Sequence, residues 1–316
     1  MMKAFQRILV GMDLTQTDYR LLEYVRMLAQ QTRPEKVYFI HISPDLSPPE
    51  FAPDLFGKFD RKPMDEQFRE EMKREVNRKI TPGIIDAEFI VVEGSVTDQL
   101  IHWSDIKQVD LVILGKKAAA LGSGIAAKRF LRRTKATVLF VPEASSLRIE
   151  KILVPTDFSD DSRLALQQAI ELAGRISPQP KILVQHVFHV PTGVHAQLSR
   201  SQEEFTDMIL INAQEYYEEW LEEVDLKGMD LAMAFEENIL FNPARHIVEK
   251  AQNSEADLLI IGAKGHTAFT AFILGSVTEK VQALNEDIPL MVVRPIQQHE
   301  PVKSHKGNRE DLLSAI

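Results

Sequence analysis

The sequence predicts an α/β fold made of two tandem, doubly wound parallel sheets with five strands each. Short runs of valine, isoleucine and leucine alternate along the chain with longer segments of helical period, which is typical of a parallel sheet covered by helices on both faces. Some of these runs, such as residues 258–261 (LLII), are apolar throughout. Strands buried on both faces require this pattern.

An internal repeat divides the chain into two similar halves. Residues 8–13 (ILVGMD) recur as residues 152–157 (ILVPTD), residues 41–42 (HI) as 186–187 (HV), and residues 110–115 (DLVILG) as 257–262 (DLLIIG). The length of 316 residues gives each half enough chain for its own core. We expect a first domain at residues 1–146, a second domain at 147–296 and a polar C-terminal tail at 297–316.

The elements of each half follow from the period of the apolar residues, which is two in strands and about 3.6 in helices. In the first half we expect strands at residues 6–12, 36–42, 84–92, 109–115 and 137–142, and helices at 16–31, 64–80, 95–107 and 122–133. In the second half we expect strands at 150–156, 180–188, 229–236, 256–262 and 288–294, and helices at 159–175, 200–225, 243–253 and 276–285.

Three segments do not fit this pattern. The proline-rich stretch 43–63 predicts a surface loop, with a lid as the alternative interpretation. Residues 143–148 interrupt two apolar runs with Ala-Ser-Ser and mark the hinge between the halves. After Pro295 the sequence turns polar, and we expect a mobile tail as far as Glu310 at least.

The composition excludes several classes of protein. The net charge is −9 without a long basic block, which argues against nucleic-acid binding. The sequence contains no cysteine, so disulfides and thiolate chemistry are excluded. Near the N-terminus the apolar run covers only residues 8–10 before Asp13. We therefore expect neither a signal peptide nor membrane binding, and a cytoplasmic location.

A glycine-rich stretch after the strand at 256–262 carries the clearest functional signal. Gly262 and Gly265 allow a positive φ and lack a Cβ, so backbone N–H groups there can approach an anion closely. Gly275 and Ser276 stand where the next helix begins, and free N–H groups and the helix dipole attract phosphate at that end. Residues 262–276, here called the glycine loop, therefore predict a phosphate site. Alternatively, Gly262 only ends a strand and residues 276–279 (SVTE) form a capping box.

Together with the strands that flank it, the glycine loop resembles the ATP-binding signature of the universal stress protein family. Residues 151–159 and 186–187 also match the places of that family's first-strand and second-strand motifs. The resemblance covers the whole second half and, more weakly, the first half. It implies a Rossmann-like, adenine-nucleotide α-hydrolase type of fold with strand order 3-2-1-4-5 in each half. It also implies pairing of the halves through their last strands, at residues 138–141 and 290–293.

The resemblance further implies an ATP-binding stress-response protein, with Mg²⁺ left open as a second ligand. In the family an aspartate at the place of Asp157 contacts the nucleoside, and the backbone at the place of Val187 meets the adenine. The residues that the resemblance assigns to nucleotide binding are Pro155, Thr156, Asp157, Val187, Gly262, Gly265, Gly275, Ser276 and Val277. A homodimer, an unidentified protein partner, and AMP or a cyclic nucleotide as the natural ligand stay open.

The first half has a broken copy of this signature. The pair Gly122-Ser123 matches Gly275-Ser276, but the loop after Gly115 is shorter and has no counterpart of Gly265. Two lysines, Lys116 and Lys117, could still attract an anion as point charges. We therefore predict one intact nucleotide site, in the second half.

Other interpretations of these residues remain at this point. Asp157 or Ser159 could simply cap the next helix. His186 and His189 would face opposite sides of a strand, so we assign no metal ligands. Without a P-loop, a nucleophile elbow or a His-Glu-x2-His pattern, we assign no catalytic residues. The competing functions are a slow ATPase or nucleotidyl transferase, and a scaffold that binds no nucleotide.

Overall fold

The computed structural model describes residues 5–44, 63–116, 124–191, 201–239, 241–265 and 274–295. Every strand and helix expected in the first half is present, with ends that differ by a few residues. The elements are β1 (Arg7–Met12), α1 (Thr17–Thr32), β2 (Lys36–Ser43), α3 (Met64–Lys79), β3 (Ala87–Glu93), α4 (Val96–Ile106), β4 (Leu111–Lys116), α5 (Gly124–Arg133) and β5 (Thr137–Pro142).

The second half repeats this order of elements. They are β6 (Lys151–Thr156), α6 (Asp160–Ala173), β7 (Lys181–Phe188), α8 (Gln202–Glu222), β8 (Leu231–Glu237), α9 (Pro243–Asn253), β9 (Leu258–Gly262), α10 (Ser276–Leu284) and β10 (Leu290–Val293). The alternation of strands and helices predicted from the apolar period is confirmed.

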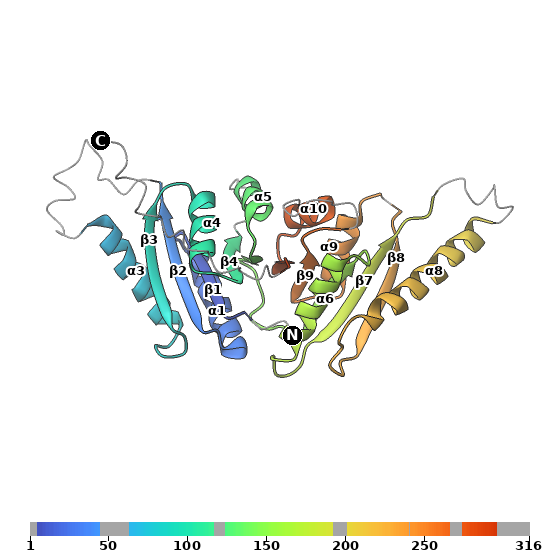
Figure 1. Ribbon diagram of the computed structural model, residues 1–316, viewed down its shortest axis with the longest axis horizontal. Coiled ribbons are helices and arrows are strands. Elements are labelled where there is room, and N and C mark those ends of the chain that lie inside the picture. The colour runs from blue at the N-terminus through green and yellow to red at the C-terminus, as the bar shows by residue number, and fades with distance from the viewer. Residues whose placement is uncertain are drawn as a thin grey trace, which may run out of the picture.

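The ten strands of the described residues form one sheet in the order β3-β2-β1-β4-β5-β10-β9-β6-β7-β8 (Figure 1). Within each half the strands are parallel and follow the order 3-2-1-4-5, as the resemblance implied. The halves meet where β5 and β10 pair antiparallel, with Leu139 opposite Met291 and Val138 opposite Val292. The expected pairing of the halves through their last strands is therefore present within one chain.

Helices cover both faces of this sheet, and each face has a core that runs through both halves. On one face α1, α3, α6 and α8 pack over strand residues such as Val10, Val154 and Met291. On the other face α4, α5, α9 and α10 pack over the alternate strand residues, such as Leu9, Leu153 and Val292. This alternation is the period of two that places successive strand residues on opposite faces.

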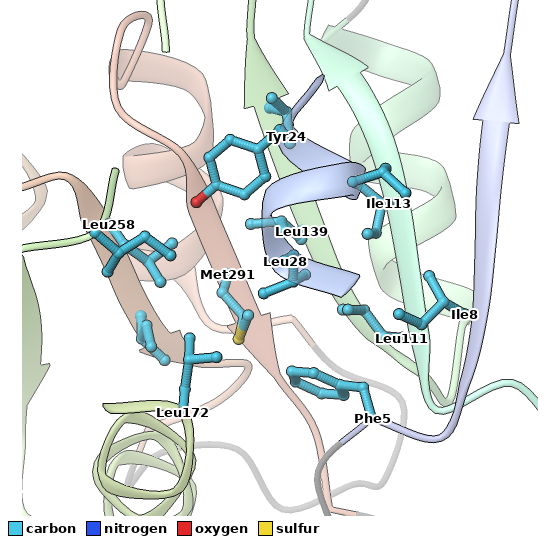
Figure 2. Close-up of a cluster of buried hydrophobic side chains, with 14 of the residues drawn as sticks. Phe5, Ile8, Tyr24, Leu28, Leu111, Ile113, Leu139, Leu172, Leu258 and Met291 are labelled. Atoms are coloured by element: carbon cyan, nitrogen blue, oxygen red, sulfur yellow. The ribbon is translucent and has the colours of Figure 1, made fainter. Parts of the chain in front are cut away.

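The first of these cores crosses the junction between the halves. Figure 2 shows Phe5, Ile8, Tyr24, Leu28, Leu111, Ile113 and Leu139 of the first half in one cluster with Leu172, Leu258 and Met291 of the second. Met291 and Tyr24 are fully buried, and burial raises the pKa of the Tyr24 hydroxyl. Fully burying a large apolar side chain contributes about 1.5–3 kcal/mol. The halves are therefore held together by side-chain packing as well as by the strand pair.

Some expectations lie outside the described residues. These are most of the proline-rich stretch 43–63, the pair Gly122-Ser123, the middle of the glycine loop at residues 266–273, and the tail 297–316. Among the helices that the structure describes, none combines the length and the apolar character needed to cross a membrane.

Candidate functional site

The first part of the site is a tight turn after β6. Phe158 has a left-handed backbone with φ of 64°, which is rare for a bulky side chain. The Oδ1 of Asp157 accepts hydrogen bonds from the N and the Oγ of Ser159 at 3.2 and 2.5 Å. Ser159 caps α6, because its Oγ accepts from the N of Ser162 at 3.3 Å. The capping alternative is thus correct for Ser159, and the Asp157 carboxylate orients that capping residue.

The first half contains the same turn. Leu14 has a φ of 57°, and the N and Oγ1 of Thr15 donate to Oδ1 of Asp13 at 3.0 and 2.6 Å. The turn is therefore a shared feature of both repeats, and by itself it does not distinguish a nucleotide site.

A histidine joins the ends of β6 and β7. His186 donates through Nδ1–H to the carbonyl oxygen of Thr156 at 2.9 Å, since a carbonyl can only accept. Its ring stacks on Phe158 with the centroids 4.3 Å apart. Burial lowers the pKa of His186 below its usual value, so the imidazole is neutral at pH 7. His186 is therefore a neutral side chain that holds the Asp157 turn through its hydrogen bond to Thr156 and its contact with Phe158.

The described ends of the glycine loop lie against this turn. A Cβ added to Gly262 would approach the backbone of Asp161 to 2.7 Å, and one added to Gly265 would collide with Oδ2 of Asp157. None of these loop glycines has a positive φ, so the backbone here does not need the conformational freedom of glycine. A side chain at position 262 would therefore meet the backbone of Asp161, and one at position 265 would have to displace the carboxylate of Asp157.

The start of α10 faces the same region. The N of Gly275 donates to the carbonyl oxygen of Ala263 at 2.8 Å, and Oγ1 of Thr278 donates to that of Gly262 at 2.8 Å. The first bond within the helix runs from the N of Glu279 to Gly275. The N–H groups of residues 276–278 thus precede the helical ladder, and the helix itself cannot satisfy them.

The capping box considered for residues 276–279 is wrong. Gly275 is the N-cap of α10, and no side chain caps this helix start. The carboxylate of Glu279 instead pairs with Lys128 and with Arg132 of α5, the latter at 2.8 Å. Burial raises the pKa of Glu279, but hydrogen bonds from both cations lower it overall. Two cations of the first half attract this carboxylate more strongly than one N–H group of its own helix.

The nine residues assigned from the resemblance lie together. All of them line one cavity of about 310 Å³ at the carboxyl ends of β6, β7 and β9. They are Pro155, Thr156 and Asp157 from β6 and its turn, Val187 from β7, Gly262 and Gly265 after β9, and Gly275, Ser276 and Val277 at the start of α10. Ligands of doubly wound sheets bind at this edge.

Seven further residues line the cavity and were not assigned from the sequence. They are Ser162, Gln185, Pro243, Ile247, Ile261, Lys264 and Thr278. The position of Lys264 between two motif glycines was a signal for one of them, and Gln185 is a polar residue that follows three apolar strand residues. Pro243 and Ile247 come from α9, and their sequence gives no sign that this helix reaches the cavity.

Two cations lie close to the acidic turn. Burial raises the pKa of the Asp161 carboxyl, while the charges of Lys264 and Arg294 oppose this shift. The N of Lys264 donates to Oδ2 of Asp161 at 3.0 Å. Burial lowers the pKa of Arg294, which the charge of Asp161 partly offsets. Opposite charges therefore lie close together beside the acidic turn.

A larger cavity, of about 660 Å³, lies at the same edge of the first half. Its lining is mainly apolar and includes Ile40, Ile42, Phe68, Leu100, Leu114, Phe130 and Phe140. A Cβ on Gly115 would meet the methyl group of Thr17 at 3.3 Å. The Nζ of Lys116 donates to the carbonyl oxygens of Gln282, at 2.6 Å, and of Asn285. In the described part of this cavity the lysine is therefore engaged with α10.

The residues that the structure describes contain no group of three or more histidine, aspartate or glutamate side chains placed to hold a metal ion.

Comparison with protein families gives two matches along the chain. A model described as the universal stress protein family matches residues 4–142 and 148–294. The chain belongs to the universal stress protein family. The universal stress protein MJ0531 of Methanocaldococcus jannaschii is 30% identical over 145 residues, which are 46% of this chain and 82% of that protein. The universal stress protein MJ0577 of the same organism is 29% identical over 161 residues, covering 47% and 97%.

Solved structures show that the tandem arrangement has precedent among universal stress proteins. A universal stress protein from Archaeoglobus fulgidus aligns with a TM-score of 0.61 and 19% identity, covering 92% of this chain and 98% of that one. The functionally unknown protein PA1789 from Pseudomonas aeruginosa aligns with a TM-score of 0.65 and 17% identity, covering 93% and 94%. At these identities the likeness shows the fold alone, over the aligned part of the chain.

Proposed function

We propose that the second universal stress protein domain binds ATP in the 310 Å³ cavity, as a nucleotide-dependent signalling or protective module. One observation carries the proposal. Nine residues chosen from the sequence, in segments up to about 120 positions apart, line the same cavity together with a helix start whose N–H groups the helix cannot satisfy.

Each part of the cavity suits a different part of a nucleotide. The N–H groups of residues 276–278 and the positive end of the α10 dipole suit phosphate oxygens. Asp157 offers carboxylate oxygens to ribose hydroxyl groups. The apolar side chains of Val187, Ile247 and Ile261 suit the faces of a planar base.

Mg²⁺ is part of the proposal because carboxylates and a polyphosphate would otherwise lie close together. Asp157 and Asp161 stand next to the glycine loop. Mg²⁺ in proteins is commonly held by one or two carboxylates together with substrate phosphates. We therefore expect ATP to bind more tightly with Mg²⁺ than in the presence of a chelator.

The bound nucleotide would order the glycine loop, and this order would be read at the junction between the halves. The contacts of α10 support this route, because the helix begins at the cavity and its Glu279 pairs with Lys128 and Arg132 of the first half. Any hydrolysis would be slow. Several turnovers per minute with Mg²⁺ and a defined acceptor would favour the competing ATPase or nucleotidyl transferase.

Isothermal titration of ATP into the full chain tests the proposal. We expect one ATP per chain for the wild type. In Gly265→Val the new side chain would collide with Asp157, so ATP should bind at least about tenfold more weakly, or about 1.4 kcal/mol. Gly174→Ala is the control, since a Cβ at this α6 end makes only ordinary contacts of 3.4 Å or more. Absence of ATP binding, or equal affinities in the wild type and Gly265→Val, would refute the proposal.

A further inference from the structure

Gln185 is a polar residue buried in the middle of a sheet. It lies on β7, where the preceding residues Ile182, Leu183 and Val184 are apolar, and its side chain has no exposed surface. Because strand residues alternate between faces, Gln185 shares a face with Val187 and lies one step deeper in the sheet. Both residues line the cavity of the second half, beside Ile247 and Ile261.

The orientation of the Gln185 amide follows from its neighbours. Its Nε2 donates to Oε2 of Glu236 at 3.0 Å and to the carbonyl oxygen of His246 at 3.3 Å. Both partners can only accept, so the NH2 group must face them and the amide cannot be turned over. The other oxygen of Glu236 pairs with Nζ of Lys250 at 2.7 Å, which holds the carboxylate in place.

This arrangement leaves the amide oxygen of Gln185 as a buried acceptor. Within the part of the chain that the structure describes, Oε1 is buried and has no hydrogen-bond partner. Buried acceptors without a donor are rare because they have lost their bond to water. An unpaired acceptor on the lining of a cavity therefore favours a ligand that brings an N–H or O–H donor.

In the first half, an apolar residue occupies the position that corresponds to Gln185. The register places Ile40 beside Gly11 of β1, as it places Gln185 beside Pro155 of β6. Ile40 is buried and lines the larger, apolar cavity. The same place in the repeat therefore carries an acceptor in one cavity and a hydrocarbon side chain in the other.

We propose that Gln185 selects the base of the bound nucleotide, by accepting a hydrogen bond from an exocyclic amino group through Oε1. The site then prefers a 6-aminopurine to a 6-oxopurine, in which two acceptors would face each other. A site built to hydrogen-bond a ligand group discriminates strongly against an analogue that lacks it. This inference rests on the proposed nucleotide site and identifies what that site recognises.

The test compares ATP with inosine triphosphate, which has the same ribose and phosphates but an oxygen in place of the 6-amino group. Titration calorimetry on the full wild-type chain should give an affinity for ATP about 10- to 100-fold above that for inosine triphosphate. The ratio of these two affinities is measured on the wild-type protein alone, so it does not depend on how a variant folds. Equal affinities would overturn the role of Gln185 and leave nucleotide binding intact, whereas absence of binding by both would overturn the site as well.

Gln185→Ile, which copies the first half, then tests the residue itself. It removes the unpaired Oε1 and also the two hydrogen bonds that Nε2 donates to Glu236 and His246, so we expect an intact fold with a somewhat lower melting temperature in a thermal unfolding measurement. We expect weaker ATP binding, nearly unchanged inosine triphosphate binding, and a ratio within about threefold of one. Leu183→Ile is the control, because Leu183 lies on the same strand and face without lining the cavity. An undiminished ratio in Gln185→Ile would also overturn the inference.

Discussion

At the scale of single residues, the two repeats keep the same turn while only one cavity contains the intact glycine motif. Asp157 and Asp13 each hold the residue two positions later through its N and its hydroxyl group. The turn alone therefore stabilises the chain similarly in both halves. A larger effect of Asp157 than of Asp13 on ATP binding would therefore indicate contact with the ligand.

We predict that Asp157→Ala weakens ATP binding at least about tenfold, while Asp13→Ala leaves it unchanged. Each substitution removes the same hydrogen bonds within a turn, so each should lower the free energy of unfolding by about 1 kcal/mol. Titration calorimetry measures the first effect and urea unfolding the second. Equal losses of ATP affinity in both variants would mean that the aspartates act only through the fold.

At the scale of elements, α10 belongs to the second half but is held by the first. Glu279 on this helix pairs with Lys128 and Arg132 of α5. The ammonium group of Lys116, the last residue of β4, donates to carbonyl oxygens at the end of α10. Those carbonyls have no partner within the helix, so a cation satisfies them and complements the helix dipole. Burial lowers the pKa of Lys116, while Glu286 and Asp287 oppose this.

We predict that Lys116→Met lowers the free energy of unfolding by about 1.5–3 kcal/mol, because two carbonyls lose a charged donor in a half-buried place. Lys151→Met is the matched control. Lys151 donates to the carbonyl of Ser254 at the end of α9, but its side chain is 45% exposed. Its loss should cost less than about 1 kcal/mol. Urea unfolding checks both values, and equal effects would show that burial of Lys116 is irrelevant.

At the scale of the whole molecule, one sheet extends through both halves (Figure 1). A core of buried side chains on each face of the sheet does the same. Neither half can lose its structure without exposing apolar residues of the other at the β5 and β10 junction. The chain should therefore unfold as one cooperative unit.

The two tryptophans provide a probe for each half. Trp103 lies on α4 of the first half and Trp220 on α8 of the second. We predict that Trp103→Phe and Trp220→Phe, each with one tryptophan left, show fluorescence transitions in urea with the same midpoint. The control is circular dichroism on the same samples, which should follow the same curve. Two separate midpoints would mean that the halves unfold independently.

Most of the fold could be predicted from the sequence because its signals are local. Apolar runs such as 258–261 gave the strands, helical periods gave the helices, and the repeat related the two halves. The nine site residues came from the resemblance to the universal stress protein family, which rests on the glycine loop and on the motifs of the first two strands of the second half. All nine line one cavity.

What only the tertiary structure decided are contacts between segments far apart in the chain. Residues 276–279 have the sequence of a capping box, yet the carboxylate of Glu279 binds α5, because folding brings two cations within reach. Likewise, Pro243 and Ile247 line the cavity because α9 packs over the sheet. The unpaired oxygen of Gln185 arises because Glu236 and His246 hold its amide from the other side. Local patterns specify the backbone, whereas competition among distant partners is settled only when the sheet has formed.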